Sequence, residues 1–215
     1  LNGAGKTTLV KLICGFYQPT EGYILVNGRP ITDYNREHYY DAISVLFQDA
    51  IVLPVSIDMN LTGQMEEKID REKLEWALKM SGIYEKYQSL PEKGNTRMVR
   101  DINENALDYS GGEMQKLLFA RALYKDAPIV ILDEPTAALD PIAEAEVYTK
   151  FNEIIGDKTA IYISHRLSSC KFCDEIAVFD EGAVVQRGNH EELLKEADGL
   201  YHELWTAQAQ YYEAG

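Results

Sequence analysis

Four short runs of apolar residues along the chain have the length and composition of buried β-strands. They cover residues 42–47, 129–132, 159–163 and 176–179. Segments with helical or polar character separate these runs. Apolar strands that alternate with helices are typical of a parallel sheet covered on both faces. The pattern therefore predicts an α/β fold built on a mostly parallel sheet.

The long stretch between the first two runs has helical periodicity and many charged residues. In residues 70–80, Leu74, Ala77 and Leu78 recur at the spacing of one helix face. A second helical run, residues 114–124, closes the stretch. We therefore expect an α-helical subdomain inserted into the α/β core. The expected division assigns residues 1–48 and 126–215 to the core and residues 49–125 to the helical subdomain.

Three further segments have clear local patterns. Residues 6–14 form a short amphipathic helix that ends at Gly15, and residues 22–28 indicate a strand closed by an Asn-Gly turn. Residues 190–212 carry apolar side chains at helical spacing. We interpret this tail as packed core rather than as a cofactor-binding element.

The charge balance narrows the choice of partners. The chain has 35 acidic and 21 basic residues and a net charge of −14, and its basic residues form no long cluster. Both features argue against a nucleic-acid backbone as the main partner. The longest apolar stretches are far shorter than the roughly 20 residues that a membrane-spanning helix needs. The chain itself is therefore not expected to cross a bilayer.

The three cysteines are an odd number in a chain without secretory features, which predicts a reducing compartment. Cys170 and Cys173 form a CxxC pair. A zinc site would need a second pair or histidines at matching spacing, and the sequence has neither. We expect both residues to be small side chains on a helix face.

The chain opens on a glycine-rich stretch that is typical of a phosphate-binding loop. Residues 1–8 read LNGAGKTT and contain every position of the pattern GxxxxGK[ST] except the first glycine. In such a loop backbone N–H groups turn toward a polyphosphate, the side chain of Lys6 reaches the β- and γ-phosphate oxygens, and a hydroxyl such as that of Thr7 binds Mg²⁺. The alternative is a glycine-rich turn before a short helix.

Two carboxylates follow the apolar run at residues 129–132. Asp133 and Glu134 would stand at the end of a strand, where a site for a Mg²⁺-nucleotide needs them. Asp133 would hold the metal, usually through water, and Glu134 would polarise the attacking water as a general base. The alternative is that both residues begin a turn before Pro135.

A capping box is expected to open the helix at residues 114–124. Ser110 and Glu113 have the required spacing, and Gly111 and Gly112 between them leave the first backbone amides of the helix exposed. The same amides could bind a phosphate, so the structural and the functional interpretation are compatible.

In this order, the motifs resemble those of the nucleotide-binding domain of ABC transporters, over nearly the whole chain. The matching stretches are NGAGKTT at 2–8 (Walker A), Gln48 (Q-loop), YSGGE at 109–113 (signature), ILDE at 131–134 (Walker B), Ala138, Leu139 and Asp140 (D-loop), and Ile163 to Arg166 around the switch histidine, His165. The resemblance implies a P-loop NTPase with a RecA-like core and an inserted helical subdomain.

The resemblance also implies an ATPase that works as a head-to-tail dimer, with ATP held between the Walker A loop of one subunit and the signature of the other. It implies Glu134, His165 and Gln48 as catalytic residues, and Thr7, Gln48 and Asp133 as groups that bind Mg²⁺. The residues implied to contact ATP are Asn2, Gly3, Ala4, Gly5, Lys6, Thr7 and Thr8 in one subunit and Ser110, Gly111, Gly112 and Glu113 in the other, with Asp140 communicating between the two sites.

Three departures from the family pattern affect these expectations. The signature reads YSGGE where the family usually has LSGGQ, so Glu113 adds a carboxylate near the phosphates held by the partner. Residues 96–108 lack the TxxGExG element that exporters often carry, which leaves the contacts with a membrane partner open. The first Walker A glycine, the leading strands and the adenine-stacking aromatic residue are absent from the sequence. We therefore expect the 215-residue chain by itself to bind ATP poorly.

Residues 48–61 and 188–210 are similar to exporter sequences. The resemblance thus implies a domain at the cytoplasmic face of the cell membrane that drives export of an unidentified substrate. Its implied partners are a transmembrane domain, fused at its N-terminal side, and a second nucleotide-binding domain, identical or different.

Two alternatives are a soluble ABC ATPase of the translation or DNA-repair type and a structural cassette that does not hydrolyse ATP. The short separation of Gln48 and Ser110 leaves no room for the coiled coil of a repair protein, and the net charge of −14 disfavours RNA. The catalytic set expected of a hydrolysing cassette is complete, which argues against the structural alternative.

Overall fold

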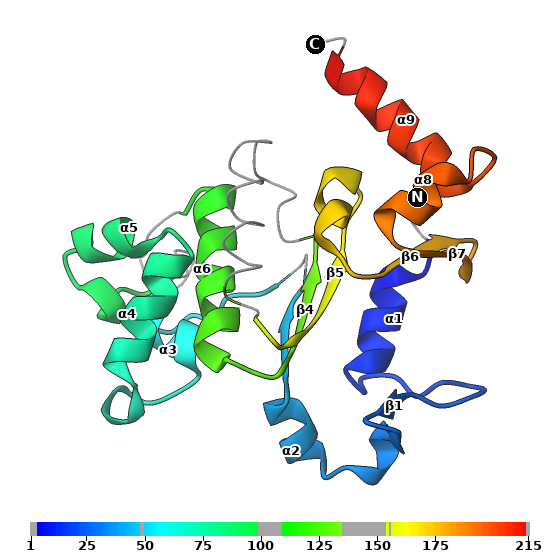
Figure 1. The fold of residues 1–215 in the computed structure, drawn as a ribbon. Helices are drawn as coiled ribbons and strands as arrows, with labels where there is room; N and C mark the ends of the chain where they lie inside the picture. Colours follow the sequence, from blue (N-terminus) through cyan, green and yellow to red (C-terminus); the bar gives the residue numbers. More distant parts are fainter. Residues whose placement is uncertain (1–3, 48–49, 99–108, 135–153, 155, 214–215) are drawn as a thin grey trace. The chain divides into compact units, whose positions relative to one another are not determined.

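The computed structural model describes residues 4–47, 50–98, 109–134, 154 and 156–213 (Figure 1). The chain divides into two compact units. The first comprises Leu1–Tyr39 and Tyr162–Gly215, and the second comprises Tyr40–Ile161. The expected division into residues 49–125 and the remainder follows different boundaries and stays a prediction. Helix α2 (Arg36–Asp41) and strand β5 (Thr159–Ile163) each run across a boundary between the units.

A three-stranded sheet has the strand order β3-β4-β5, and its strands β3 and β4 lie in the second unit. Strand β3 (Ile43–Leu46) pairs in parallel with β4 (Ile129–Asp133), in a register that joins Ile43 to Ile129 and Leu46 to Leu132. Most side chains of these two strands are buried. Burial on both faces explains the almost continuous apolar runs, and the parallel pairing confirms the fold class predicted from them.

Helix α6 (Gly111–Lys125) packs against strand β3 of this sheet (Figure 1), and most of its residues from Leu117 to Tyr124 are buried. The hydroxyl of Ser44 on β3 donates to the carbonyl of Ala122, at 3.1 Å. This bond satisfies a polar group that would otherwise cost free energy inside the core. Helix α6 is therefore held in register with the strands beside it.

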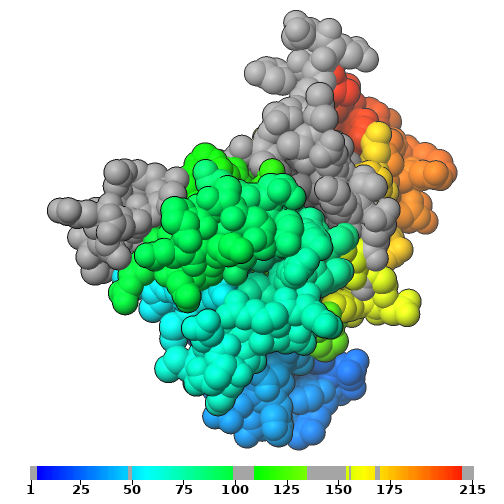
Figure 2. Space-filling model, turned by 90° about the vertical axis from the view of Figure 1, so that its left-hand side faces the viewer, coloured from blue at the N-terminus to red at the C-terminus, as the bar shows by residue number. Residues whose placement is uncertain are grey.

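Helices α3 (Ile57–Thr62) and α4 (Arg71–Met80) pack on α6, and α5 (Tyr84–Ser89) packs on α4. The segments α3 to α6 form a continuous surface in Figure 2, cyan to green. Leu74, Ala77 and Leu78 are all buried, which confirms the amphipathic helix predicted for residues 70–80. Two 3-10 turns, Glu66–Lys68 and Lys93–Asn95, complete this helical region.

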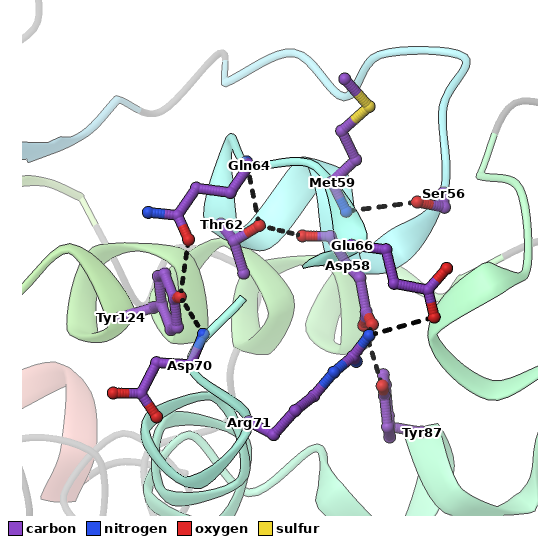
Figure 3. A network of polar contacts seen from close by, with 10 residues as sticks. All are labelled: Ser56, Asp58, Met59, Thr62, Gln64, Glu66, Asp70, Arg71, Tyr87 and Tyr124. Carbon is purple, nitrogen blue, oxygen red and sulfur yellow. Dashed lines mark hydrogen bonds and ion pairs between the residues drawn. The ribbon is translucent and has the colours of Figure 1, made fainter. Parts of the chain in front are cut away.

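A buried carboxylate ties these short helices together (Figure 3). Asp58 on α3 is only 4% exposed, accepts a hydrogen bond of 2.8 Å from the Tyr87 hydroxyl and is paired with Arg71. Burial and the bond to Asp58 raise the pKa of Tyr87. A Cβ at position 94 would overlap the Asp58 carboxylate, so Gly94 is required by space. The network fixes α3, α4 and α5 to one another.

In the first unit, α1 (Lys6–Ile13) is the helix predicted from residues 6–14. Strands β1 (Leu25–Val26) and β2 (Arg29–Pro30) form a small hairpin, followed by a 3-10 turn at Ile31–Asp33. Asn27 and Gly28 at its tip have φ values of 52° and 75°, which confirms the Asn-Gly turn. The strand expected over residues 22–28 is shorter than predicted, because only its last part finds a partner strand.

Strand β6 (Ile176–Asp180) pairs antiparallel with β7 (Ala183–Gly188) in a separate two-stranded sheet. This corrects the expectation that residues 176–179 belong to the parallel sheet. A tight turn at Glu181 and Gly182, both with positive φ, reverses the chain directly after β6. The Glu-Gly pair between two β-like runs was the available signal for this hairpin.

The tail forms two helices, α8 (His190–Lys195) and α9 (Leu200–Glu213). Buried residues from β6, α8 and α9 form a cluster, against which residues of a 3-10 helix, Leu167–Phe172, also pack; the four buried members are Ile176, Val178, Leu193 and Tyr201. This confirms that the tail belongs to the packed core. Cys170 and Cys173 pack on the same cluster, and neither forms a disulfide in the described part of the chain.

Among the described residues, no helix is both long and apolar enough to cross a membrane.

Candidate functional site

The predicted phosphate loop leads directly into helix α1. Gly5 is its N-cap residue, with φ 94° and ψ 1°, and no side chain in the described part of the chain caps this end. A Cβ at Gly5 would meet only Gly182, at an ordinary 3.6 Å, so the backbone conformation rather than space requires glycine here. The first turn contains no acidic residue. A helix N-terminus of this kind favours an anion.

Three candidate residues occupy the first turn of α1. Lys6 is half-buried, whereas Thr7 and Thr8 are exposed. Ala4, just before the N-cap, is 5% exposed and packs into the core. The loop is thus anchored through Ala4, while Thr7 and Thr8 lie at the surface.

The two carboxylates predicted for the metal and the base follow one another at the end of β4. Asp133 is only 2% exposed, and Glu134 is half-buried. Glu134 has φ 52°, a left-handed conformation that residues other than glycine adopt rarely and at an energetic cost. Strained backbone of this kind clusters at functional sites. The buried strand therefore delivers one shielded and one partly accessible carboxylate.

The predicted capping box at the start of α6 is confirmed. The backbone N–H of Glu113 donates to the Ser110 hydroxyl oxygen at 3.3 Å, and the backbone N–H of Ser110 donates to the Glu113 carboxylate at 3.0 Å. Such a cap contributes about 1 kcal/mol. Gly111 and Gly112 occupy the first helical positions, where they add no side chain over the amides.

The charge of Glu113 is balanced by a residue that the sequence analysis missed. Lys86 on α5 places its ammonium nitrogen 3.3 Å from the Glu113 carboxylate. The bond from the Ser110 backbone and the contact with Lys86 lower the pKa of Glu113, so it is ionised at neutral pH. Tyr109 lies next to it, and burial followed by the charge of Glu113 raises the pKa of Tyr109 to about 12. No local spacing links residues 86 and 113, so the sequence carried no signal for this pair.

His165 follows the end of β5 in a tight turn. The Arg166 backbone N–H donates to the Ser164 hydroxyl at 2.9 Å, which closes this turn from within. Gln208 of α9 closes it from outside: its amide N–H donates to the His165 carbonyl at 2.6 Å, and its amide oxygen accepts from the Leu167 backbone N–H at 3.0 Å. The sequence analysis also missed Gln208.

The candidate residues are distributed over both compact units. Residues 4–8 and His165 belong to the first unit, and residues 110–113, Asp133 and Glu134 belong to the second. Four predicted site residues lie outside the described residues, namely Asn2, Gly3, Gln48 and Asp140.

The fold and these motifs define a nucleotide-binding domain of the ABC type. Residues 1–137 match the sequence profile of the family described as ABC transporter, and the chain belongs to this family. Membership implies that the domain binds ATP. It also agrees with the P-loop NTPase fold predicted from the sequence.

Two curated relatives and one solved structure are similar to nearly the whole chain. The ATP-dependent lipid A-core flippase of Cupriavidus pinatubonensis (strain JMP 134 / LMG 1197) is 40% identical over 96% of this chain, which covers 35% of that protein. The mitochondrial iron-sulfur clusters transporter ABCB7 of Danio rerio is 36% identical over 96% of this chain and 27% of that protein. A bacterial Atm1-family ABC exporter with ATP bound has a TM-score of 0.87 and 34% identity, covering 97% of this chain and 36% of that one. The chain thus spans about a third or less of the length of these relatives.

Proposed function

We propose that this chain is the ATP-hydrolysing domain of an ABC exporter. The observation that carries the proposal is the likeness, over 97% of the chain, to an exporter whose structure has ATP bound. The signature, Walker A and Walker B residues described above are those that such a domain needs. The names of the two curated relatives differ in what is transported, so the exported substrate of this protein is left open.

The chemistry of the described residues fits a nucleoside triphosphate and Mg²⁺. The N-terminus of α1, with Lys6 and the hydroxyls of Thr7 and Thr8, offers donors and a positive charge to phosphate oxygens. The shielded carboxylate of Asp133 suits a hydrated metal ion. Gln48, which lies outside the described residues, would complete the metal site in this proposal. Bound Mg²⁺ would neutralise charge on the phosphates.

Glu134 accepts a proton from the attacking water in this proposal, and His165 contacts the γ-phosphate. The signature residues Ser110 and Gly112 act on ATP held by a second nucleotide-binding domain, in a head-to-tail dimer. Asp140 would communicate between the two sites. The pair formed by Lys86 and Glu113 presents a nearly neutral surface there, which offsets the extra carboxylate of this signature.

A transmembrane domain and a position at the cytoplasmic face of the membrane are part of the same proposal. The partial coverage of the transporter relatives supports a membrane partner. Two alternatives, a non-transport ABC ATPase and a cassette that does not hydrolyse ATP, have no specific observation in their favour. Sedimentation of the protein with membranes after cell lysis distinguishes the first alternative from the proposal.

The substitution Glu134→Gln tests the general base. We expect the full-length variant to lose ATP turnover by about 100-fold or more and to accumulate as an ATP-bound dimer, because the amide cannot take the proton. Turnover and dimerisation are measured by phosphate release and size-exclusion chromatography. The exposed Glu85→Gln serves as a control. Normal turnover in Glu134→Gln would contradict the assignment.

A further inference from the structure

We propose that Gln208 is a positioning residue for His165. Its side-chain amide spans the backbone on both sides of Arg166, with one bond to the His165 carbonyl and one from the Leu167 N–H. The role rests on the proposed function, in which His165 contacts the γ-phosphate. Nothing in the motifs of the nucleotide site includes this residue.

The two bonds fix the orientation of the amide. A carbonyl oxygen can only accept and a backbone N–H can only donate, so the Gln208 nitrogen must face His165 and its oxygen must face Leu167. The distances of 2.6 Å and 3.0 Å satisfy both groups at once. The turn that carries His165 therefore has both its carbonyl and a following amide held by one side chain.

Helix α9 delivers Gln208 from a firmly anchored face. Tyr201, Trp205 and Gln208 stand at positions i, i+4 and i+7, which share one side of a helix. Tyr201 is 1% exposed, and its hydroxyl lies 2.8 Å from the Nδ1 atom of His190. Lys171 lies over the Trp205 ring, with its ammonium 4.7 Å from the ring centre. On this face of α9 the polar residue Gln208 thus follows Tyr201 and Trp205, where the helix meets the turn of His165.

The arrangement explains why an amide is used at this position. A shorter side chain would not span both backbone groups, and an apolar one would leave the His165 carbonyl and the Leu167 N–H without this partner. A carboxylate could still accept from Leu167 but would face the His165 carbonyl with a second acceptor. Gln208→Glu therefore removes half of the clamp at constant length, and Gln208→Leu removes all of it at similar size.

The test measures ATP hydrolysis by the full-length protein and its Gln208→Glu and Gln208→Leu variants. We expect kcat to fall about 10- to 100-fold with KM for ATP changed less than about 2-fold, because the geometry of the histidine changes while the phosphate loop does not. Glu203→Gln, on the exposed side of α9, is the matched control and should keep the wild-type kcat. A Gln208 variant with wild-type kcat would overturn the inference.

Two further measurements separate positioning from a general loss of stability. Adding Gln208→Leu to His165→Ala should lower kcat by less than about 2-fold more, since the two residues act as one unit; multiplied effects would overturn the inference. Hydrogen exchange at the Leu167 amide should accelerate in Gln208→Leu and stay slow in Gln208→Glu. Equal exchange in both variants would also overturn it. If the wild-type protein hydrolyses no ATP, the proposed function itself fails, whereas an active wild type with normal Gln208 variants refutes the clamp alone.

Discussion

The signature at the start of α6 and the turn of His165 are held in opposite ways. At the signature, Ser110 and Glu113 cap each other across three positions of sequence. At the turn, the clamping residue Gln208 lies 43 positions after His165. The capping box forms together with helix α6 itself. The bonds from Gln208, in contrast, form only when α9 has packed against the turn of His165. The two ends of the proposed catalytic machinery therefore depend on different parts of the fold.

The largest effect is expected from truncating Tyr201, the member of the buried cluster that α9 contributes. Tyr201→Ala should lower the free energy of unfolding by about 3 kcal/mol or more, because a large side chain that is 1% exposed leaves a cavity. ATP hydrolysis should fall with it, since α9 no longer presents Gln208. Chemical denaturation measures the first effect. Tyr23→Ala, at a side chain 74% exposed in the same unit, should change little.

A smaller effect is expected from removing the local cap. Ser110→Ala should cost about 1 kcal/mol, the usual value for an N-cap residue. Hydrogen exchange should accelerate at the first amides of α6 and stay unchanged at Leu167. Faster exchange at the α6 amides and at Leu167 would show that the capping box and the Gln208 bonds are coupled, which would contradict the contrast between them.

Acidification should lower the free energy of unfolding in two different pH windows, one set by His190 beside α9 and one set by Glu113 at the signature. Burial and Lys171 lower the pKa of His190, so its contribution to stability is present above about pH 6.5 and is lost as pH falls below that value, through the lowered pKa of the folded state. The pKa of Glu113 is lowered as well, mainly by the Ser110 backbone bond, so its contribution is lost only as pH falls below about 4.5. Unfolding measured against pH for wild type, His190→Gln and Glu113→Gln checks the order. Loss of the Glu113 contribution near pH 6.5 would contradict it.

The smallest effect concerns the ion pair at the signature. Lys86→Met should raise KM for ATP about 2- to 5-fold, because an uncompensated Glu113 then faces the phosphates, and exposed pairs of this kind are worth about 1 kcal/mol or less. Glu113→Gln in the same protein should restore KM. Lys79→Met breaks the pair with Glu75 on α4 and serves as the control. An unchanged KM in Lys86→Met would remove Lys86 from the site.

The same contrast explains how much could be predicted from the sequence. The capping box, helix α4 and the Asn-Gly turn depend on residues a few positions apart, and all three were predicted. The antiparallel pairing of β6 also had a local signal, the turn at Glu181 and Gly182, which the sequence analysis did not use. The partner of Glu113 and the clamp on His165, in contrast, depend on contacts between distant residues. Their side chains give no periodic signal, and only the packed chain brings them together. Motif order identified the family because it records function directly rather than through packing.

Glu134 carries a consequence for engineering this domain. Its φ of 52° is the conformation that glycine adopts most easily, so Glu134→Gly should relieve local strain. The same change removes the carboxylate proposed as the base. Selection for thermal stability alone would therefore favour glycine at position 134, although glycine abolishes the proposed ATP hydrolysis. Mutant libraries designed to stabilise this domain should keep position 134 fixed.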